Sequence, residues 1–153
     1  MNPTGIETKW RLREATGALA ALLLMYAADP VGADGARSTA IVVPLTTKDL
    51  TGSAGKEAVM LRVEYPPGGA SLPHRHDAHV FVYVLEGSLV MQVDGQDPVT
   101  LKQGETFYES PQDVHRQSAN ASATEPAKFL VFMVKDKGKP SSRPPAPEHW
   151  TQQ

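Results

Sequence analysis

Residues 68–87 read GGASLPHRHDAHVFVYVLEG, in which a turn rich in glycine leads through two histidines into a run of valine and aromatic residues. Side chains alternate between the two faces of a β-strand, so His74 and His76 are expected to point to the same face. Imidazole is a common protein ligand for zinc, iron, copper and nickel. The stretch therefore predicts a strand region that carries part of a metal site.

A third histidine, His115, follows a second strand-turn-strand segment that begins at Gly104. The sequence has no cysteine, so nitrogen and oxygen atoms must hold any metal. We predict that His74, His76 and His115 bind one divalent transition metal, with Fe, Mn, Zn, Ni and Cu all open. The alternative is that they are polar residues at a barrel rim without a metal. Burying three imidazoles without partners costs about 1–3 kcal/mol for each unsatisfied group, which favours the metal site.

The size and charge of the chain narrow the class of protein. With 153 residues it has the length of one domain with additional ends. The formal net charge of -2 provides no basic field for binding nucleic acid.

The region after residue 40 has the pattern of an all-β domain. Short runs rich in Val, Leu, Phe, Tyr and Thr alternate with turns of Gly, Pro, Asp and Gln. Eight strands are predicted, at residues 40–45, 57–65, 79–86, 88–93, 99–102, 105–109, 114–118 and 128–134. Many short strands without a helical pattern predict an antiparallel sandwich or barrel.

The two ends of the chain differ from this domain. Basic residues precede an uncharged apolar run at 15–28, and small residues follow, so residues 1–33 are predicted to be a signal peptide. The protein is then periplasmic or secreted, and has no membrane contact once the signal is removed. An uncleaved membrane anchor or a helix docked on the domain are the alternatives. Residues 34–39 are a predicted linker, 40–136 the domain, and 137–153 a flexible Pro-rich tail.

The histidine-bearing stretches resemble the two sequence motifs of the cupin superfamily. Four residues match the first motif: Gly68, His74, His76 and Gly87. Four match the second, the proline and asparagine each displaced by one position: Gly104, Pro111, His115 and Asn120. The resemblance covers residues 57–135 and implies a small jelly-roll β-barrel. It also implies a metal bound by three histidines and a glutamate.

The sequence departs from the first motif at one ligand position. The glutamate of the motif should stand seven residues before Gly87, where this chain has Val80. Glu109 and His79 are the two candidates for a fourth ligand, and also for a general base. His79 has the opposite strand parity to Val80, so it reaches the site only if a β-bulge lies near residues 77–78.

Three classes of function follow from the resemblance. The first is a mononuclear metalloenzyme of dioxygenase type acting on a small organic substrate, with isomerase or lyase activity as a variant. The second is a non-catalytic module that binds a metal or a small molecule in an apolar interior lined by Val80, Val82, Val84 and Val90. A storage or structural role is the least favoured.

Alternation along the predicted strand 79–86 also places apolar residues on its outer face. Phe81, Tyr83 and Leu85 would form an exposed apolar patch, and such patches usually mark interfaces. The sequence therefore predicts a homodimer that associates through this face.

Overall fold

The computed structural model describes residues 39–146. The predicted signal peptide, most of the linker and residues 147–153 of the tail lie outside this range. In the described part of the chain no helix has the length and hydropathy of a membrane span. The described residues form ten strands: β1 (Ile41–Asp49), β2 (Lys56–Tyr65), β3 (Ala70–Ser71), β4 (His74–Arg75), β5 (Ala78–Glu86), β6 (Ser88–Val93), β7 (Val99–Lys102), β8 (Thr106–Glu109), β9 (Val114–Asn120) and β10 (Ala127–Asp136).

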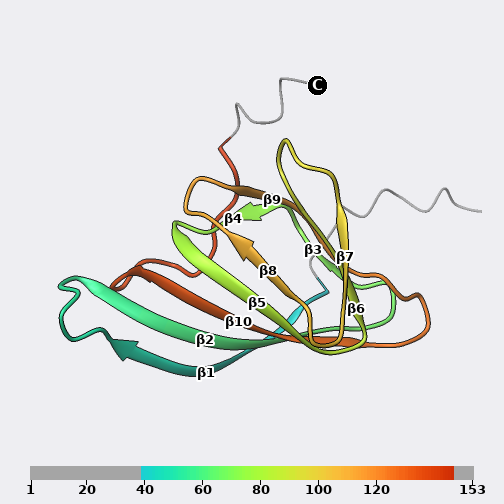
Figure 1. Ribbon diagram of the computed structural model, residues 1–153, viewed down its shortest axis with the longest axis horizontal. Coiled ribbons are helices and arrows are strands. Elements are labelled where there is room, and N and C mark those ends of the chain that lie inside the picture. Colours follow the sequence, from blue (N-terminus) through green and yellow to red (C-terminus); the bar gives the residue numbers. More distant parts are fainter. Residues whose placement is uncertain (1–38, 147–153) are drawn as a thin grey trace, which may run out of the picture. The chain divides into compact units, whose positions relative to one another are not determined.

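The strands form two antiparallel sheets, as the sequence predicts for a cupin-type jelly roll (Figure 1). One sheet has the order β1-β2-β10-β5-β8. The other has the order β3-β9-β6-β7, with β4 paired to β9 beside this path. Each of the eight predicted strands corresponds to an observed strand. Their ends differ by a few residues in places, because pairing with β2 extends β1 and β10 beyond the apolar runs that marked them.

Two strands were not predicted, and one of them matters for the site. β3 and β4 have two residues each, which is too short for an alternating pattern, and Pro73 separates them. β4 exists because its residues pair with β9, with His74 opposite His115 and Arg75 opposite Val114. Tertiary pairing, rather than local propensity, creates this strand.

The core lies between the inner faces of the two sheets. Along β5 the buried residues Ala78, Val80, Val82 and Val84 alternate with exposed residues, as expected for a sheet with one face in the core. The prediction that Val90 also faces inward is wrong. On β6 the inward residues are Leu89, Met91 and Val93, whereas Val90 is only half-buried.

Gly87, in the turn between β5 and β6, determines which residues of β6 face the core. Its φ is 73°, in the left-handed region that glycine adopts without strain. A Cβ atom added there would lie 2.6 Å from the carbonyl oxygen of Pro126, so the close approach of the neighbouring chain also requires glycine. The last glycine of the first motif therefore has a packing role.

Candidate metal centre

The three predicted ligands converge on one point inside the protein. His74 lies on β4 and His76 directly follows it, while His115 lies on β9 and is the register partner of His74. Each of the three residues offers one ring nitrogen, and these atoms all lie within 4.8 Å of one another. Metal–nitrogen bonds of about 2.1 Å allow a separation of up to roughly 4.2 Å, so a bound ion draws the rings slightly together. The cluster could hold one metal ion.

Backbone carbonyl groups fix the orientation of two of the rings. His74 Nδ1 donates to the Leu72 carbonyl oxygen at 2.7 Å, and His76 Nδ1 donates to the Ser141 carbonyl oxygen at 2.5 Å. In the neutral rings both Nε2 atoms are then unprotonated acceptors. These two Nε2 atoms face each other at 3.1 Å. Two lone pairs at this distance repel unless a proton or a cation lies between them, and 3.1 Å fits two ligands of one ion.

His115 is buried, with 3% of its surface exposed, and its Nδ1 atom faces the Glu109 carboxylate, while its Nε2 atom has no hydrogen-bond partner among the described residues. Its ring stacks on Phe107, with the ring centroids 6.0 Å apart and the planes 29° from parallel. A buried polar atom without a partner is costly and usually marks a ligand or ion site. A metal at the centre of the cluster would satisfy this imidazole, so the residues present fit the expected group.

A carboxylate enters the cluster from β8. Glu109 is 2% exposed, and its Oε2 atom lies 3.1 Å from His115 Nδ1 and 3.9 Å from His76 Nε2. Glu109 is the register partner of Val80 in the pairing of β5 with β8. The position that lacks the glutamate of the motif therefore lies opposite a glutamate on the adjacent strand.

The charge states of these groups favour the binding of a cation. Burial raises the pKa of the Glu109 carboxyl, but His115, His76 and His74 lower it more, so the net shift is downward and the group stays ionised. Burial, with a further contribution from His76, lowers the pKa of His74 to about 4. His74 is therefore neutral near pH 7, and a neutral imidazole is the form that binds metals.

His79 lies outside the cluster. Its side chain is exposed, and its Nδ1 atom lies 2.7 Å from the hydroxyl oxygen of Tyr108 on the outer face of the sheet. β5 pairs with β10 in regular register from Ala78 to Val84, so no bulge turns His79 inward. Of the two candidates for a fourth ligand or a general base, only Glu109 reaches the three histidines.

A cavity of about 130 Å³ adjoins the cluster. Its polar lining comes from the site and from hydroxyl groups, and its apolar lining comes mainly from β2 and β10. The lining residues are His76, Glu109, His115, Tyr65, Ser71, Ser141, Ser142, Val42, Leu61, Val63, Phe129, Val131 and Met133. Neither lysine nor arginine occurs among these described residues.

Sequence reasoning missed two sets of polar groups at this cavity. The Tyr65 hydroxyl lies 2.7 Å from the hydroxyl oxygens of both Ser71 and Ser118, which fixes it at the cavity wall. Ser141 belongs to the predicted flexible tail, and it contacts His76 through a backbone carbonyl that no side-chain pattern could reveal. The alternation that places Tyr65 inward was available in the sequence, but its hydrogen-bond partners come from distant strands.

The two-sheet fold and the histidine cluster in its interior place this chain in the class of jelly-roll β-proteins with a candidate metal site. The cupin-domain family matches residues 61–133, which span β2 to β10 and include all three histidines. Residues 61–133 of this chain therefore belong to the cupin-domain family.

Solved structures show the same fold. An oxalate oxidase in complex with the substrate analogue glycolate has 23% identity and a TM-score of 0.54, with 71% of this chain and 56% of that chain covered. A cupin-2 domain protein from Rhodospirillum rubrum has 18% identity and a TM-score of 0.53, with coverages of 72% and 68%. A cupin superfamily protein from Desulfitobacterium hafniense has 16% identity and a TM-score of 0.53, with coverages of 66% and 83%. No curated protein matches the sequence.

Proposed function

We propose that this cupin binds one divalent transition metal through His74, His76 and His115, with Glu109 as the fourth ligand. The facing Nε2 atoms of His74 and His76, 3.1 Å apart with both Nδ1 atoms bonded to carbonyl oxygens, are the main support. Glu109 supports the same site because its Oε2 atom lies at a ligand–ligand distance from His76 Nε2. Fe, Mn, Zn, Ni and Cu all suit three imidazoles and a carboxylate in differing degree.

We further propose that the site is catalytic, of dioxygenase type. Four protein ligands leave positions open on a metal that accepts five or six, where it would act as a Lewis acid or a redox centre. The protein supplies the remaining requirements. Apolar residues of β2 and β10 line the cavity, and among the described lining residues Glu109 is the one carboxylate.

The cavity lining indicates the class of substrate. Apart from the proposed metal, the described residues that line the cavity include no lysine or arginine side chain to balance the charge of a multiply charged anion. The apolar wall and the Tyr65 and Ser71 hydroxyls suit a small, largely uncharged organic molecule with an oxygen donor for the metal. Enediols and phenols have this combination.

Oxygen consumption tests the catalytic proposal. We expect metal-loaded protein to consume O₂ with at least one member of a panel of small enediols and phenols when it holds Fe, Mn, Ni or Cu, but not when it holds redox-inactive Zn. The activity should disappear in His115→Ala. Stoichiometric metal binding without turnover for any metal or compound would favour the alternative, a non-catalytic module that binds a metal or a small molecule.

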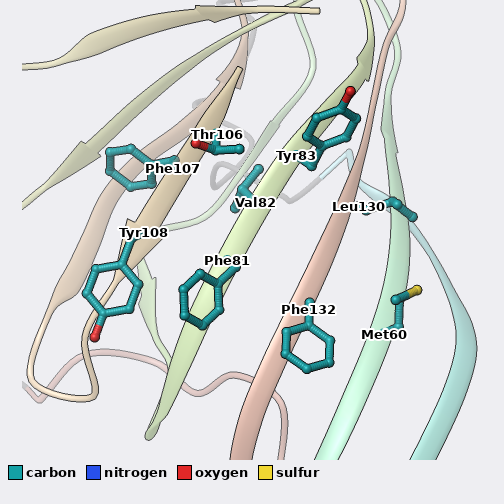
Figure 2. Close-up of a pocket in the computed structure, with 9 residues that line it drawn as sticks. All are labelled: Met60, Phe81, Val82, Tyr83, Thr106, Phe107, Tyr108, Leu130 and Phe132. Atoms are coloured by element: carbon teal, nitrogen blue, oxygen red, sulfur yellow. The ribbon is translucent and has the colours of Figure 1, made fainter. Parts of the chain in front are cut away.

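The outer face of β5 and its neighbours remains a proposed dimer interface. Phe81 is 49% exposed and Tyr83 46% exposed, and both point away from the core, whereas Leu85 is only half-buried. Figure 2 shows Phe81 between Tyr108 and Phe132 on this face, with ring centroids 5.2 and 6.3 Å from that of Phe81. A contiguous aromatic patch of this kind favours self-association.

Light scattering at micromolar concentration tests the interface. We expect wild-type protein to have the mass of a dimer and Phe81→Asp to have that of a monomer, because a charge buried in an apolar interface costs several kcal/mol. Glu86→Asp, at an exposed position of the same strand, is the control and should remain a dimer. A monomeric wild type contradicts the proposal.

A further inference from the structure

The chain after β10 turns back toward the candidate metal centre (Figure 1). At the start of this turn, the buried Lys135 ammonium bonds the Glu57 carboxylate and the carbonyl oxygen of Lys139. Gly138 donates its backbone N–H to the same carboxylate at 3.3 Å. A buried ion pair is stable only when its remaining hydrogen-bonding groups are satisfied, and here the turn satisfies them. The turn that redirects the chain is therefore anchored in the interior.

A second anchor fixes the chain on the far side of the site. Arg143 forms an isolated antiparallel bridge with Arg75, through two backbone hydrogen bonds of 2.9 and 3.0 Å. The Arg143 guanidinium also contacts both carboxylate oxygens of Asp77, at 2.7 and 3.0 Å. Arg75 and Asp77 flank His76 in the sequence. Residues 138–143, near the start of the predicted flexible tail, are thus attached at both ends.

Between these anchors the segment contacts a proposed metal ligand. The carbonyl oxygen of Ser141 accepts the hydrogen bond from His76 Nδ1. Ser141 and Ser142 line the cavity beside the cluster, and Ser142 and Arg143 also line a depression next to His74. Ser141 and Ser142 therefore form part of the cavity wall on this side.

We infer that residues 140–143 are part of the metal centre, with Ser141 as a positioning residue for His76. This inference rests on the proposed metal site. The carbonyl of Ser141 sets the tautomer of His76 and aims its Nε2 atom at the cluster. Partners of this kind change metal affinity although they do not touch the metal. Because coupling between two equilibria is reciprocal, a segment that strengthens metal binding must itself be held more firmly when the metal is bound.

The test compares metal affinity among variants. The contact uses the backbone of Ser141, so a side-chain substitution there cannot remove it. We expect a chain that ends at residue 139 to bind Zn²⁺ about 10- to 100-fold more weakly than wild type, with a smaller loss in the same direction for Arg143→Ala. Lys128→Ala removes an exposed ion pair with Glu86 on the outer side of β10 and should leave the affinity unchanged.

Hydrogen exchange of the amides of Arg75 and Arg143 supplies a readout that does not depend on activity. Both amides donate across the bridge, so Zn²⁺ should slow their exchange by about the factor by which the segment raises affinity. If the truncated chain fails to fold, the Zn²⁺ affinity of Arg143→Ala and the hydrogen-exchange rates of the two amides test the inference instead. Wild-type affinity in folded variants, or exchange insensitive to Zn²⁺, would overturn the inference while leaving the metal site intact. A wild type that binds no metal would overturn both.

Discussion

His115→Ala should abolish the stabilisation of this protein by metal. A ligand at 100 times its Kd adds about 2.7 kcal/mol to the free energy of unfolding, which corresponds to roughly 10 °C in Tm for a domain of this size. His115 is the one of the three histidines whose ring is held by no backbone carbonyl, and its buried Nε2 atom has no hydrogen-bond partner among the described residues, so a metal is the partner that this nitrogen lacks. Its loss should weaken metal affinity by more than about 100-fold, since even indirect partners contribute 10- to 100-fold.

The prediction is tested by the shift in Tm on adding metal. For each variant this shift is measured against the metal-free form of the same variant. Truncation to alanine also leaves a cavity, which lowers the Tm of the metal-free protein and must be subtracted. His79→Ala is the matched control, because His79 is exposed and bonds only Tyr108 on the outer face. The control should keep the full shift. An equal shift in His115→Ala would show that the ion binds elsewhere.

Moving the carboxylate across the strand pair should first remove and then restore tight metal binding. Glu109 and Val80 are direct register partners, and such pairs have Cβ atoms about 4.5–5.5 Å apart. Both side chains are fully buried and point inward. Glu109→Val should therefore weaken metal affinity by about 10- to 100-fold or more. Adding Val80→Glu to that variant places a carboxylate where the first cupin motif has its glutamate, and should recover most of the loss.

Further variants of these positions distinguish a carboxylate that binds the metal from one that only stabilises the fold. Glu109→Gln keeps the shape but loses the charge, and it should resemble Glu109→Val in metal affinity while folding more stably. Glu86→Val, at an exposed position of β5, should have no effect on affinity. If Val80→Glu fails to restore affinity in a double variant that folds, the carboxylate acts only from β8, as an orienting partner of His115.

The sequence was sufficient for eight of the ten observed strands and for the grouping of the three histidines. Period-2 alternation correctly placed Val80, Val82 and Val84 in the core and Phe81 and Tyr83 outside. The same rule placed His74 and His76 on one face, and their ring nitrogens do lie in one cluster. These features are local, so they depend on the residues alone.

The features that the sequence could not provide are all non-local. The fourth ligand was open between Glu109 and His79 because the choice depends on which strand lies beside β5, and this is a property of the topology. The parity of β6 depends on the turn at Gly87, which put Leu89 rather than Val90 inside. The contact of Ser141 with His76 uses a carbonyl group in a segment whose composition indicated flexibility.

The metal content of untagged wild-type protein tests the central claim most directly. We expect one transition-metal ion per chain, with an X-ray absorption spectrum that fits three imidazole nitrogens at about 2.0–2.1 Å and at least one oxygen. A chelator should remove the ion and lower the Tm, and adding the metal back should restore it. Protein without stoichiometric metal, whose Tm changes neither with chelator nor with added ions, would contradict the account.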